Sequence, residues 1–298
     1  MKILRADHLG MCFGVRDAIA LALETAQSQP LTILGDLVHN ETVLAHLRAA
    51  DIALERDPER IRTHTVMITA HGAADRQVDA LRQRGHAVLE ATCPLVHAAH
   101  RVLQDLVRSG YHPVVIGLRD HVEVRGLTGD LQEFDVVITA GEVEQLRERP
   151  RFGVVAQTTQ PIQRVWLLAD LIRQRFPESE VRVIDTVCRP TKLRQWSAEN
   201  LSARCDVVIV VGGAHSNNTR ELAETCRHQG TRVHQVQNAN EIRPDWIRGA
   251  QTVGLTAGTS TPDAVIEAVE RRLRELAGNE KPAFEPAAAL ASEPGLGR

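Results

Sequence analysis

The chain has 298 residues, of which 43% are hydrophobic, 24% charged and 3% aromatic, and its formal net charge is −3. This composition excludes collagen-like, disulfide-scaffold and disordered chains, and it allows one large soluble domain or two to three small ones. The low aromatic share and the lack of any basic block argue against nucleic acid as a partner.

The N-terminal segment and the hydropathy pattern indicate where the protein works. Lys2 and Arg5 place charge too early for a secretory signal. No apolar run in the sequence approaches the roughly 18–20 residues that cross a bilayer. We therefore expect a cytoplasmic protein that does not associate with a membrane.

Short apolar runs alternate with longer amphipathic stretches along the chain. The runs predict strands at residues 31–34, 65–69, 112–116, 136–138, 153–156, 206–211 and 252–256. The stretches between them predict helices at Val15–Gln27, Arg76–Arg84, Val96–Ser109, Gln163–Arg175 and Thr191–Ala203. Runs that are apolar on both faces are typical of buried parallel strands, so the pattern indicates an α/β fold. We expect the last segment, residues 279–298, to be a disordered and dispensable tail.

A small polar cluster follows most of the predicted strands. The clusters occupy residues 38–42, 69–72, 117–129, 157–160, 212–219 and 256–261. In parallel α/β sheets, ligands bind outside the carboxyl ends of the strands, where the next helix offers free N–H groups to an anion. Six such clusters predict a polar pocket that is built from many loops.

Three of the five cysteines, Cys12, Cys93 and Cys188, each lie between an apolar run and an amphipathic helix. They are separated by 81 and 95 residues, about the length of one α/β unit. The spacing predicts three similar units, at residues 1–93, 94–188 and 189–278. An odd number of cysteines in a cytosolic chain also argues against a disulfide framework.

The residues around these cysteines allow two interpretations. A helix N-terminus lowers the pKa of a thiol, and three soft thiolates suit an iron–sulfur cluster with one open iron position. Alternatively, the cysteines are small buried hydrophobic residues, since the sequence contains no Cys-x-x-Cys motif. Cys205, which enters a strand, and Cys226, inside a helix, fit this second interpretation.

Three histidines, His39, His71 and His121, follow predicted strands in equivalent positions. A single histidine of this kind is more often a capping or core residue, but three together favour an anionic substrate. Glu123 lies two residues after His121. A carboxylate beside an anion pocket is electrostatically costly, which favours a proton donor over a solvated loop residue.

The same segments resemble a known family. Nine motifs occur in order along residues 1–275: Gly10-Met11-Cys12-Phe13-Gly14-Val15, Val38-His39-Asn40, Ala70-His71-Gly72, Ala91-Thr92-Cys93-Pro94-Leu95-Val96, His121-x-Glu123, Gln157-Thr158-Thr159, Asp185-Thr186-x-Cys188-x-x-Thr191-x-x-Arg194-Gln195, Ser216-Asn217-Asn218 and Thr256-Ala257-Gly258-x-Ser260. In this order they resemble the 4-hydroxy-3-methylbut-2-enyl diphosphate reductases, the LytB family.

The resemblance implies a fold and a set of site residues. The fold is a trefoil of three pseudo-equivalent α/β units, with mainly parallel sheets, around a central [4Fe–4S] cluster. Cys12, Cys93 and Cys188 are implied as the cluster ligands, and Glu123 as the carboxylate that delivers a proton. The implied substrate contacts are His39, His71, His121, Thr158, Ser216, Asn217, Asn218 and Ser260.

The resemblance also implies a reaction, the last step of the methylerythritol phosphate route to isoprenoid precursors. The substrate hydroxyl would bind the open iron, two electrons and protons would enter, and water would leave. The products would be isopentenyl and dimethylallyl diphosphate. An external ferredoxin or flavodoxin would supply the electrons.

The loop around Glu123 departs from the family pattern His-Pro-Glu-Val-Glu-Gly. Val122 replaces the proline and Arg125 replaces the second acid. Two alternatives stay open: an enzyme with the same cluster and another phosphorylated substrate, or a non-catalytic iron–sulfur sensor or binding module. The retained Glu123 argues against the sensor.

Overall fold

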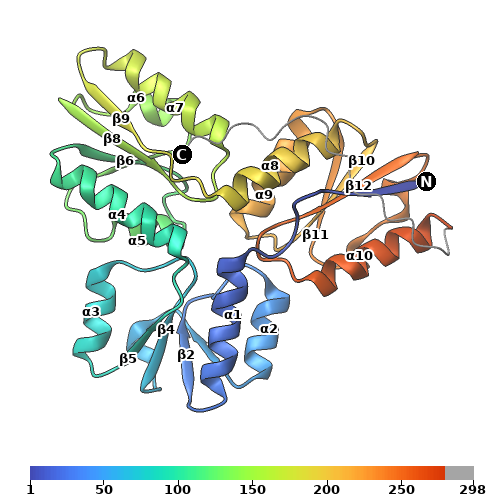
Figure 1. Ribbon diagram of the computed structural model, residues 1–298, viewed down its shortest axis with the longest axis horizontal. Coiled ribbons are helices and arrows are strands. Elements are labelled where there is room, and N and C mark those ends of the chain that lie inside the picture. The colour runs from blue at the N-terminus through green and yellow to red at the C-terminus, as the bar shows by residue number, and fades with distance from the viewer. Residues whose placement is uncertain (279–298) are drawn as a thin grey trace. The chain divides into compact units, whose positions relative to one another are not determined.

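The structure, a computed structural model, describes residues 1–278. These residues form two compact units, residues 12–192 in one and residues 1–11 with 193–278 in the other. Their strands build three four-stranded sheets (Figure 1). Every strand pair is parallel. The predicted α/β class is therefore confirmed, and the trefoil arrangement of three units stays a prediction.

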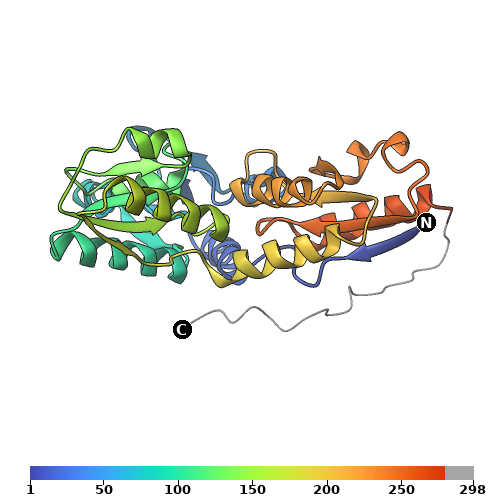
Figure 2. The same cartoon turned by 90° about the horizontal axis from the view of Figure 1, so that it is seen from above.

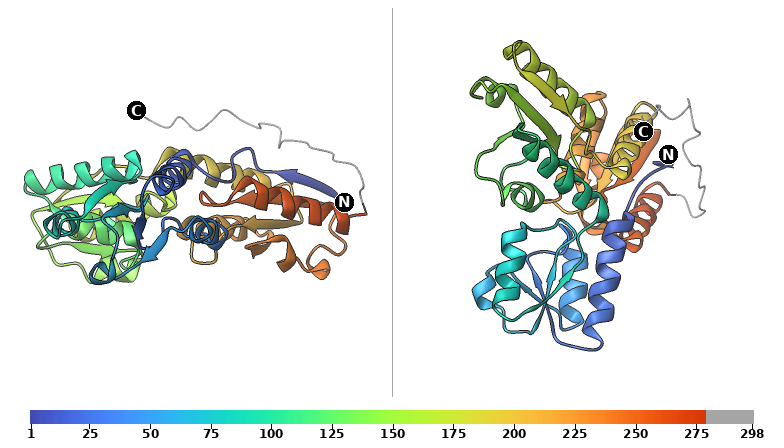
Figure 3. Two further views of the ribbon diagram at one scale, coloured as in Figure 1. Left: turned by 90° about the horizontal axis from the view of Figure 1, so that it is seen from below. Right: turned by 60° about the vertical axis from the view of Figure 1, so that its left-hand side comes forward.

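The first sheet has the strand order β3-β2-β4-β5. It is built from α1 (Phe13–Ala26), β2 (Leu31–Leu34), α2 (Glu41–Ala49), β3 (Ala53–Glu55), η1 (Pro58–Arg60), β4 (Thr65–Ile68), α3 (Asp75–Gln83) and β5 (Ala87–Glu90). All four residues of β4 are buried. Helix α3 covers one face through Val78 and Leu81, and the right-hand panel of Figure 3 shows helices on both faces.

The second sheet has the order β7-β6-β8-β9. Its elements are α4 (Pro94–Arg108), β6 (His112–Ile116), α5 (Val122–Thr128), β7 (Asp135–Val137), α6 (Ala140–Glu144), β8 (Arg151–Ala156), α7 (Ile162–Arg175) and β9 (Glu180–Val183). Helices α4 and α5 pack on one face around Leu103 and Val124, and helices α6 and α7 pack on the other around Val143 and Leu168.

The third sheet has the order β1-β12-β10-β11. Its elements are β1 (Lys2–Arg5), α8 (Arg189–Ser202), β10 (Val207–Val211), α9 (Asn217–His228), β11 (Arg232–Val236), η2 (Ala239–Glu241), η3 (Pro244–Trp246), β12 (Thr252–Ala257) and α10 (Asp263–Leu276). The core residues of α8 and α9 pack on one face and those of α10 on the other, as Figure 2 also shows.

All three sheets repeat one topology. In each sheet, the chain passes from one inner strand to the outer strand beside it and then crosses back to the other inner strand. The direction in which successive strands are added therefore reverses between β2 and β4, β6 and β8, and β10 and β12. Ligands of open α/β sheets bind at such reversal points. In each sheet, one outer strand, β5, β9 or β1, is followed by a cysteine, Cys93, Cys188 or Cys12, just before the next helix begins.

The first strand departs from the predicted unit boundaries. Residues 2–5 were expected in a unit spanning residues 1–93, but β1 pairs with β12 in register Lys2↔Thr252. The physical reason is the hydrogen bonding of β12. Without β1, one edge of β12 would lack the partner strand that β5 provides for β4 and β9 provides for β8. The predicted tail, residues 279–298, lies outside the described residues. Among residues 1–278, no helix is both long and apolar enough to span a membrane.

Candidate active site

The three predicted histidines lie together in the unit of residues 12–192. His39 follows β2, His71 follows β4 and His121 follows β6. The ring centroids are 4.6 Å apart for His39 and His71, 5.2 Å for His39 and His121, and 5.5 Å for His71 and His121. The carboxyl ends of inner strands from two different sheets therefore present one imidazole cluster.

Local structure fixes each histidine. After His39, Asn40 caps α2 by accepting hydrogen bonds from the N–H groups of Thr42 and Val43, at 3.0 and 3.3 Å. After His71, Gly72 has φ +78°, a left-handed conformation that glycine adopts without strain, and the chain turns back there. His121 is itself the N-cap residue of α5.

The imidazole nitrogens in this cluster suit an anion better than a cation. One nitrogen from each of His39, His71 and His121 lies within 4.8 Å of the others, which alone would also permit a metal ion. However, Nδ1 of His121 accepts a hydrogen bond from the backbone N–H of Glu123 at 3.2 Å. In a neutral ring the proton then sits on Nε2, which is a donor and not a metal ligand.

The environment keeps His71 uncharged. Burial lowers the pKa of His71 well below its usual value, and the neighbouring His39 and His121 lower it further. A neutral imidazole carries one N–H, and Nδ1 of His71 is buried without a hydrogen-bond partner among the described residues. The cluster thus offers buried ring nitrogens that a bound ligand could pair.

Glu123 is a buried acid beside this cluster. It lies in the first turn of α5, is 1% exposed, and its Oε1 accepts a 2.6 Å hydrogen bond from the backbone N–H of Thr158. Burial raises the pKa of Glu123 to about 7, although the hydrogen bonds from Thr158 act in the opposite direction. A carboxyl group with this pKa is protonated to a large extent near neutral pH and can donate a proton.

The three predicted cysteine ligands also lie in one region of this unit. Cys12 and Cys93 occupy the N-cap positions of α1 and α4, and Cys188 directly precedes α8. Cys12 and Glu123 both lie near enough to Cys93 and Cys188 to act on their thiols electrostatically. The cysteines are free thiols with intermediate exposure.

The expected lowering of the thiol pKa by the helix ends is wrong for two of these cysteines. Burial raises the pKa of Cys93 above its ordinary value, and it raises the pKa of Cys188 to about 11. Hydrogen bonds from the following turn, including one between Thr191 Oγ1 and Cys188 Sγ at 3.1 Å, oppose this only in part. Desolvation therefore outweighs the helix dipole in the metal-free thiols.

The space around Cys93 depends on a glycine. A Cβ atom added at Gly14 would lie 2.6 Å from Sγ of Cys93, far inside van der Waals contact. Gly14 is the second residue of α1, two residues after Cys12. The bare backbone therefore lets the first turn of α1 approach the Cys93 thiol, as a bulky inorganic group held by both cysteines would require.

The remaining predicted substrate residues lie in the other compact unit, at the reversal point of the third sheet. Ser216 caps α9, and Asn217 and Asn218 form its first turn. Ser260 follows β12, and all four residues are 5% exposed or less. A Cβ atom at Gly258 would lie 3.5 Å from Nδ2 of Asn218, so the two loops are in contact.

Three buried polar atoms at the start of α9 and the end of β12 lack partners among the described residues. They are Nδ2 of Asn218, Oγ1 of Thr219 and Oγ1 of Thr256. Buried polar groups are normally paired, so such a concentration indicates a place where a polar ligand binds. Asn218 is one of the predicted substrate contacts, whereas Thr219 is not among them.

Comparison with known proteins identifies the family. A family model described as LytB protein matches residues 3–274. The chain belongs to the LytB family. The resemblance that the nine motifs indicate is thus confirmed, and it extends over almost all described residues of this LytB chain.

Relatives and solved structures agree. This LytB chain is 36% identical to the 4-hydroxy-3-methylbut-2-enyl diphosphate reductase of Aquifex aeolicus (strain VF5), covering 93% of this chain and 97% of the relative. It is 37% identical to that of Trichlorobacter lovleyi (strain ATCC BAA-1151 / DSM 17278 / SZ), covering 93% and 99%. A solved (E)-4-hydroxy-3-methyl-but-2-enyl diphosphate reductase is 35% identical, with a TM-score of 0.66 and coverage of 92% and 100%.

A more distant solved structure shares the fold. It is the E-1-hydroxy-2-methyl-but-2-enyl-4-diphosphate reductase from Plasmodium falciparum, which is 22% identical, with a TM-score of 0.87 and coverage of 92% of this LytB chain and 88% of the other. The three-sheet architecture is therefore a property of the fold that persists at low identity.

Thr158 and Gln157 make hydrogen bonds in the candidate site that the sequence does not predict. Thr158, predicted as a substrate contact, donates its backbone N–H to Glu123. Gln157 is fully buried, and its Oε1 accepts hydrogen bonds from the Leu118 N–H and the Gln160 side chain, which ties the loops after β6 and β8 together. The only sequence signal for these hydrogen bonds was the Gln157-Thr158-Thr159 motif.

Proposed function

We propose that this chain is a 4-hydroxy-3-methylbut-2-enyl diphosphate reductase, which carries out the reductive dehydroxylation that ends the methylerythritol phosphate pathway. The observation that carries the proposal is Glu123, a buried carboxyl with a pKa raised to about 7, which bonds to His121 through its backbone and lies near enough to Cys93 and Cys188 to act on their thiols electrostatically. The family membership and the names of the relatives support it.

The histidine cluster is the proposed site for the diphosphate. The N–H groups of neutral imidazoles donate hydrogen bonds to phosphate oxygens, and burial strengthens such bonds. His121 supports this most directly, since its Nδ1 accepts from the Glu123 N–H, so that in a neutral ring the proton is carried by Nε2. The same ligand contacts are proposed for His39, His71, Thr158, Ser216, Asn217, Asn218 and Ser260.

Glu123 is the proposed proton donor. Its Oε1 is held by the Thr158 N–H at 2.6 Å, which fixes the carboxyl group, and its raised pKa lets it carry a proton near neutral pH. Hydroxide is a poor leaving group, so the allylic C–O bond breaks more readily when the departing oxygen is protonated. Overall, two electrons and two protons enter, the C–O bond breaks, and water leaves with isopentenyl or dimethylallyl diphosphate as product.

Cys12, Cys93 and Cys188 are proposed to hold a [4Fe–4S] cluster. The donor set fits this group, because three free thiols lie in one region and Gly14 leaves room beside Cys93. When bound, the cluster would supply electron transfer and an open iron position for a substrate oxygen. Because burial raises the pKa of two of the thiols, loading the metal must release protons from them.

The electrons are proposed to come from an external ferredoxin or flavodoxin. The observation in favour is that all three cysteines have intermediate exposure, because electron transfer from a docked donor needs a cofactor that is not deeply enclosed. The next residue after Cys12, Phe13, is 46% exposed.

The test is an anaerobic assay with dithionite-reduced viologen as the reductant and 4-hydroxy-3-methylbut-2-enyl diphosphate as the substrate, read with the iron content. We expect a brown protein with about four iron atoms per chain and release of both five-carbon diphosphates. A colourless, iron-free protein after reconstitution would overturn the proposal. Iron-loaded protein that binds the substrate without turnover would instead support an enzyme for another phosphorylated substrate, the alternative that Val122 and Arg125 raise.

A further inference from the structure

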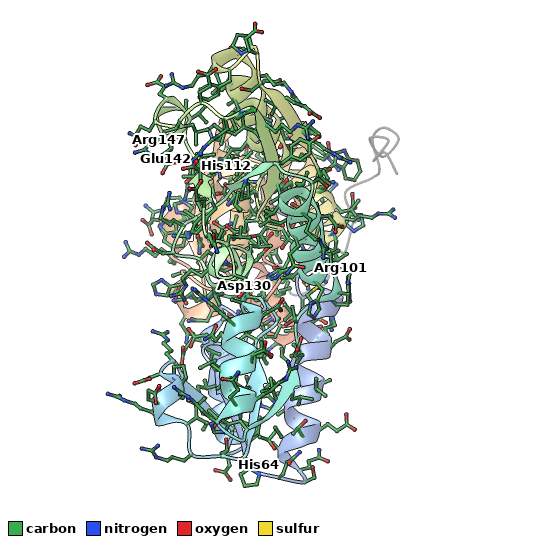
Figure 4. The ribbon with its side chains drawn as sticks, turned by 90° about the vertical axis from the view of Figure 1, so that its left-hand side faces the viewer. His64, Arg101, His112, Asp130, Glu142 and Arg147 are labelled. Atoms are coloured by element: carbon green, nitrogen blue, oxygen red, sulfur yellow. The ribbon has the colours of Figure 1, made fainter. Side chains whose placement is uncertain are left out.

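The N-terminus of α3 is capped from a distant part of the chain. Its own N-cap residue, Ala74, has no side chain that can accept a hydrogen bond. The first N–H groups of a helix need an acceptor. The Asp130 carboxylate accepts from the N–H of Asp75 at 2.7 Å and from that of Arg76 at 2.9 Å, across more than 50 residues. Figure 4 labels Asp130 just above the start of α3.

The backbones around this cap are in unusually close contact. Asp130 follows the C-cap of α5, Gly129, where a Cβ atom would lie 2.5 Å from Cβ of Ala74. One turn earlier, a Cβ atom at Gly126 would lie 3.5 Å from Cα of Ala73. Helix α5 thus packs backbone against backbone on the segment that enters α3, and the first and second sheets meet there.

His100 of α4 fills the remaining side of this junction. Cβ atoms built at Gly72 and Gly126 would lie 3.7 and 3.5 Å from its Nε2, so the ring is wedged between the two backbones. That Nε2 atom is buried without a hydrogen-bond partner among residues 1–278. The ring therefore acts as a spacer. The first N–H groups of α3 donate to Asp130, and the Gln104 side chain of α4 donates a longer bond of 3.4 Å to the Asp75 carboxylate.

The junction connects the two halves of the histidine cluster. The segment held by Asp130 carries His71, four residues before Asp75, and α5 begins with His121 and Glu123. The separation of 5.5 Å between the His71 and His121 rings therefore depends on how α3 is held against α5. We infer that Asp130 is a positioning residue, which sets His71 against His121 and Glu123 for diphosphate binding.

This inference rests on the proposed function for its ligand, and its test separates the two. The variants are Asp130→Ala, Asp130→Asn and, as matched control, Thr139→Ala. Thr139 caps α6 through a local capping box, with a 3.2 Å hydrogen bond from the Glu142 N–H, and takes no part in the junction. Both alanine variants lose a helix N-cap, although the charged Asp130 accepts two hydrogen bonds and Thr139 accepts one.

The first measurement is the affinity of the anaerobic holoenzyme for inorganic diphosphate by calorimetry, with KM and kcat for the organic substrate. We expect Asp130→Ala to weaken diphosphate binding and raise KM by about five- to tenfold, with a smaller change in kcat. Asp130→Asn keeps one acceptor oxygen and should fall in between. Thr139→Ala should lower the melting temperature and leave both constants unchanged. If Asp130→Ala kept the wild-type affinity for diphosphate and the wild-type KM, Asp130 would only stabilise the helix as its cap, and the inference would be overturned.

The second measurement is hydrogen–deuterium exchange, which needs no ligand. Asp130→Ala should speed exchange in residues 69–74 and also in 121–128, whereas Thr139→Ala should change neither. Unchanged exchange in 121–128 would overturn the positioning role, whatever the outcome for the proposed function. Conversely, failure of the wild type to bind diphosphate would contradict the proposed function, and the exchange data would still decide the role of Asp130.

Discussion

Glu123 and His121 are joined by a hydrogen bond between the Glu123 backbone and the His121 ring, and the Glu123 carboxyl group has a different partner. The backbone N–H of Glu123 donates to Nδ1 of His121 at 3.2 Å, while the Glu123 side chain turns to the N–H of Thr158. One residue therefore supports the ring of His121 with its backbone and holds an acid with its side chain. A substitution that keeps the backbone separates these two functions.

Glu123→Gln should abolish turnover and keep ligand binding. Glutamine preserves the acceptor for the Thr158 N–H and the backbone bond to His121, but it carries no transferable proton. We expect kcat to fall by about 100-fold or more, with iron content and diphosphate affinity unchanged. Anaerobic kinetics and calorimetry measure these quantities. A fully active Glu123→Gln enzyme would remove the proton-donor assignment.

Activity should decline as pH rises through the pKa of Glu123. Burial raises this pKa to about 7, so the protonated donor predominates below that pH and is depleted above it. We expect kcat to fall by about tenfold per pH unit on the alkaline side. A kcat profile that is flat from pH 6 to pH 9 would contradict protonated Glu123 as the donor.

The same group should make stability depend on pH. Its folded-state pKa of about 7 lies above the ordinary value of 4.5, so the folded state holds the proton more tightly. The stabilisation is fully present below pH 4.5 and is lost as pH rises through 7, by roughly 3 kcal/mol in total. Urea unfolding at pH 5 and pH 8 should show this loss in the wild type and not in Glu123→Gln. An equal loss in both proteins would assign it to other groups.

The five cysteines should divide into two classes. Cys12→Ser, Cys93→Ser and Cys188→Ser should each lose the intact cluster, because a serine hydroxyl is a harder and poorer ligand for iron. Cys205→Ser and Cys226→Ser should keep their iron, and Cys226→Ser should lower the melting temperature because that side chain is fully buried in the core. Iron analysis of anaerobic preparations decides. Loss of iron in all five would refute the ligand set.

Gly14→Ala should reduce iron loading without unfolding the protein. The added Cβ would lie 2.6 Å from Sγ of Cys93, so the thiol has to move. Gly141→Ala in α6 is the control, since nothing lies within 4 Å of its added Cβ and alanine favours a helix. We expect the control to retain full iron content. Normal loading in Gly14→Ala would show that the Cys93 thiol has room elsewhere.

Sequence patterns predicted the inner strands much better than the outer ones. The run that became β10 has five fully buried apolar residues, which is the pattern of a central parallel strand. In β9, Glu180 and Arg182 alternate with valines because one face is exposed, and no continuous run marks it. Helix α5 was expected as part of a polar loop, since it has only seven residues and depends on His121 for its cap.

Motifs predicted the site residues, but the pKa shift of one of them and a contact between two distant segments depend on tertiary structure. The direction of the pKa shift of Cys188 follows from burial, which a helix-start motif does not encode. The contact of Asp130 with Asp75 joins segments that are far apart in the chain, and no local pattern indicates it. Where the chain brings distant segments together, only the folded structure supplies the neighbours.

The pairing of β1 with β12 has a consequence for biogenesis. Lys2 leaves the ribosome early, but its partner Thr252 follows some 250 residues later. Until then the strand that leads into Cys12 has no sheet to join, while the sheets beside Cys93 and Cys188 are already encoded in the nascent chain. The strand that precedes Cys12 is therefore made first but paired last among the three outer strands that precede a cysteine.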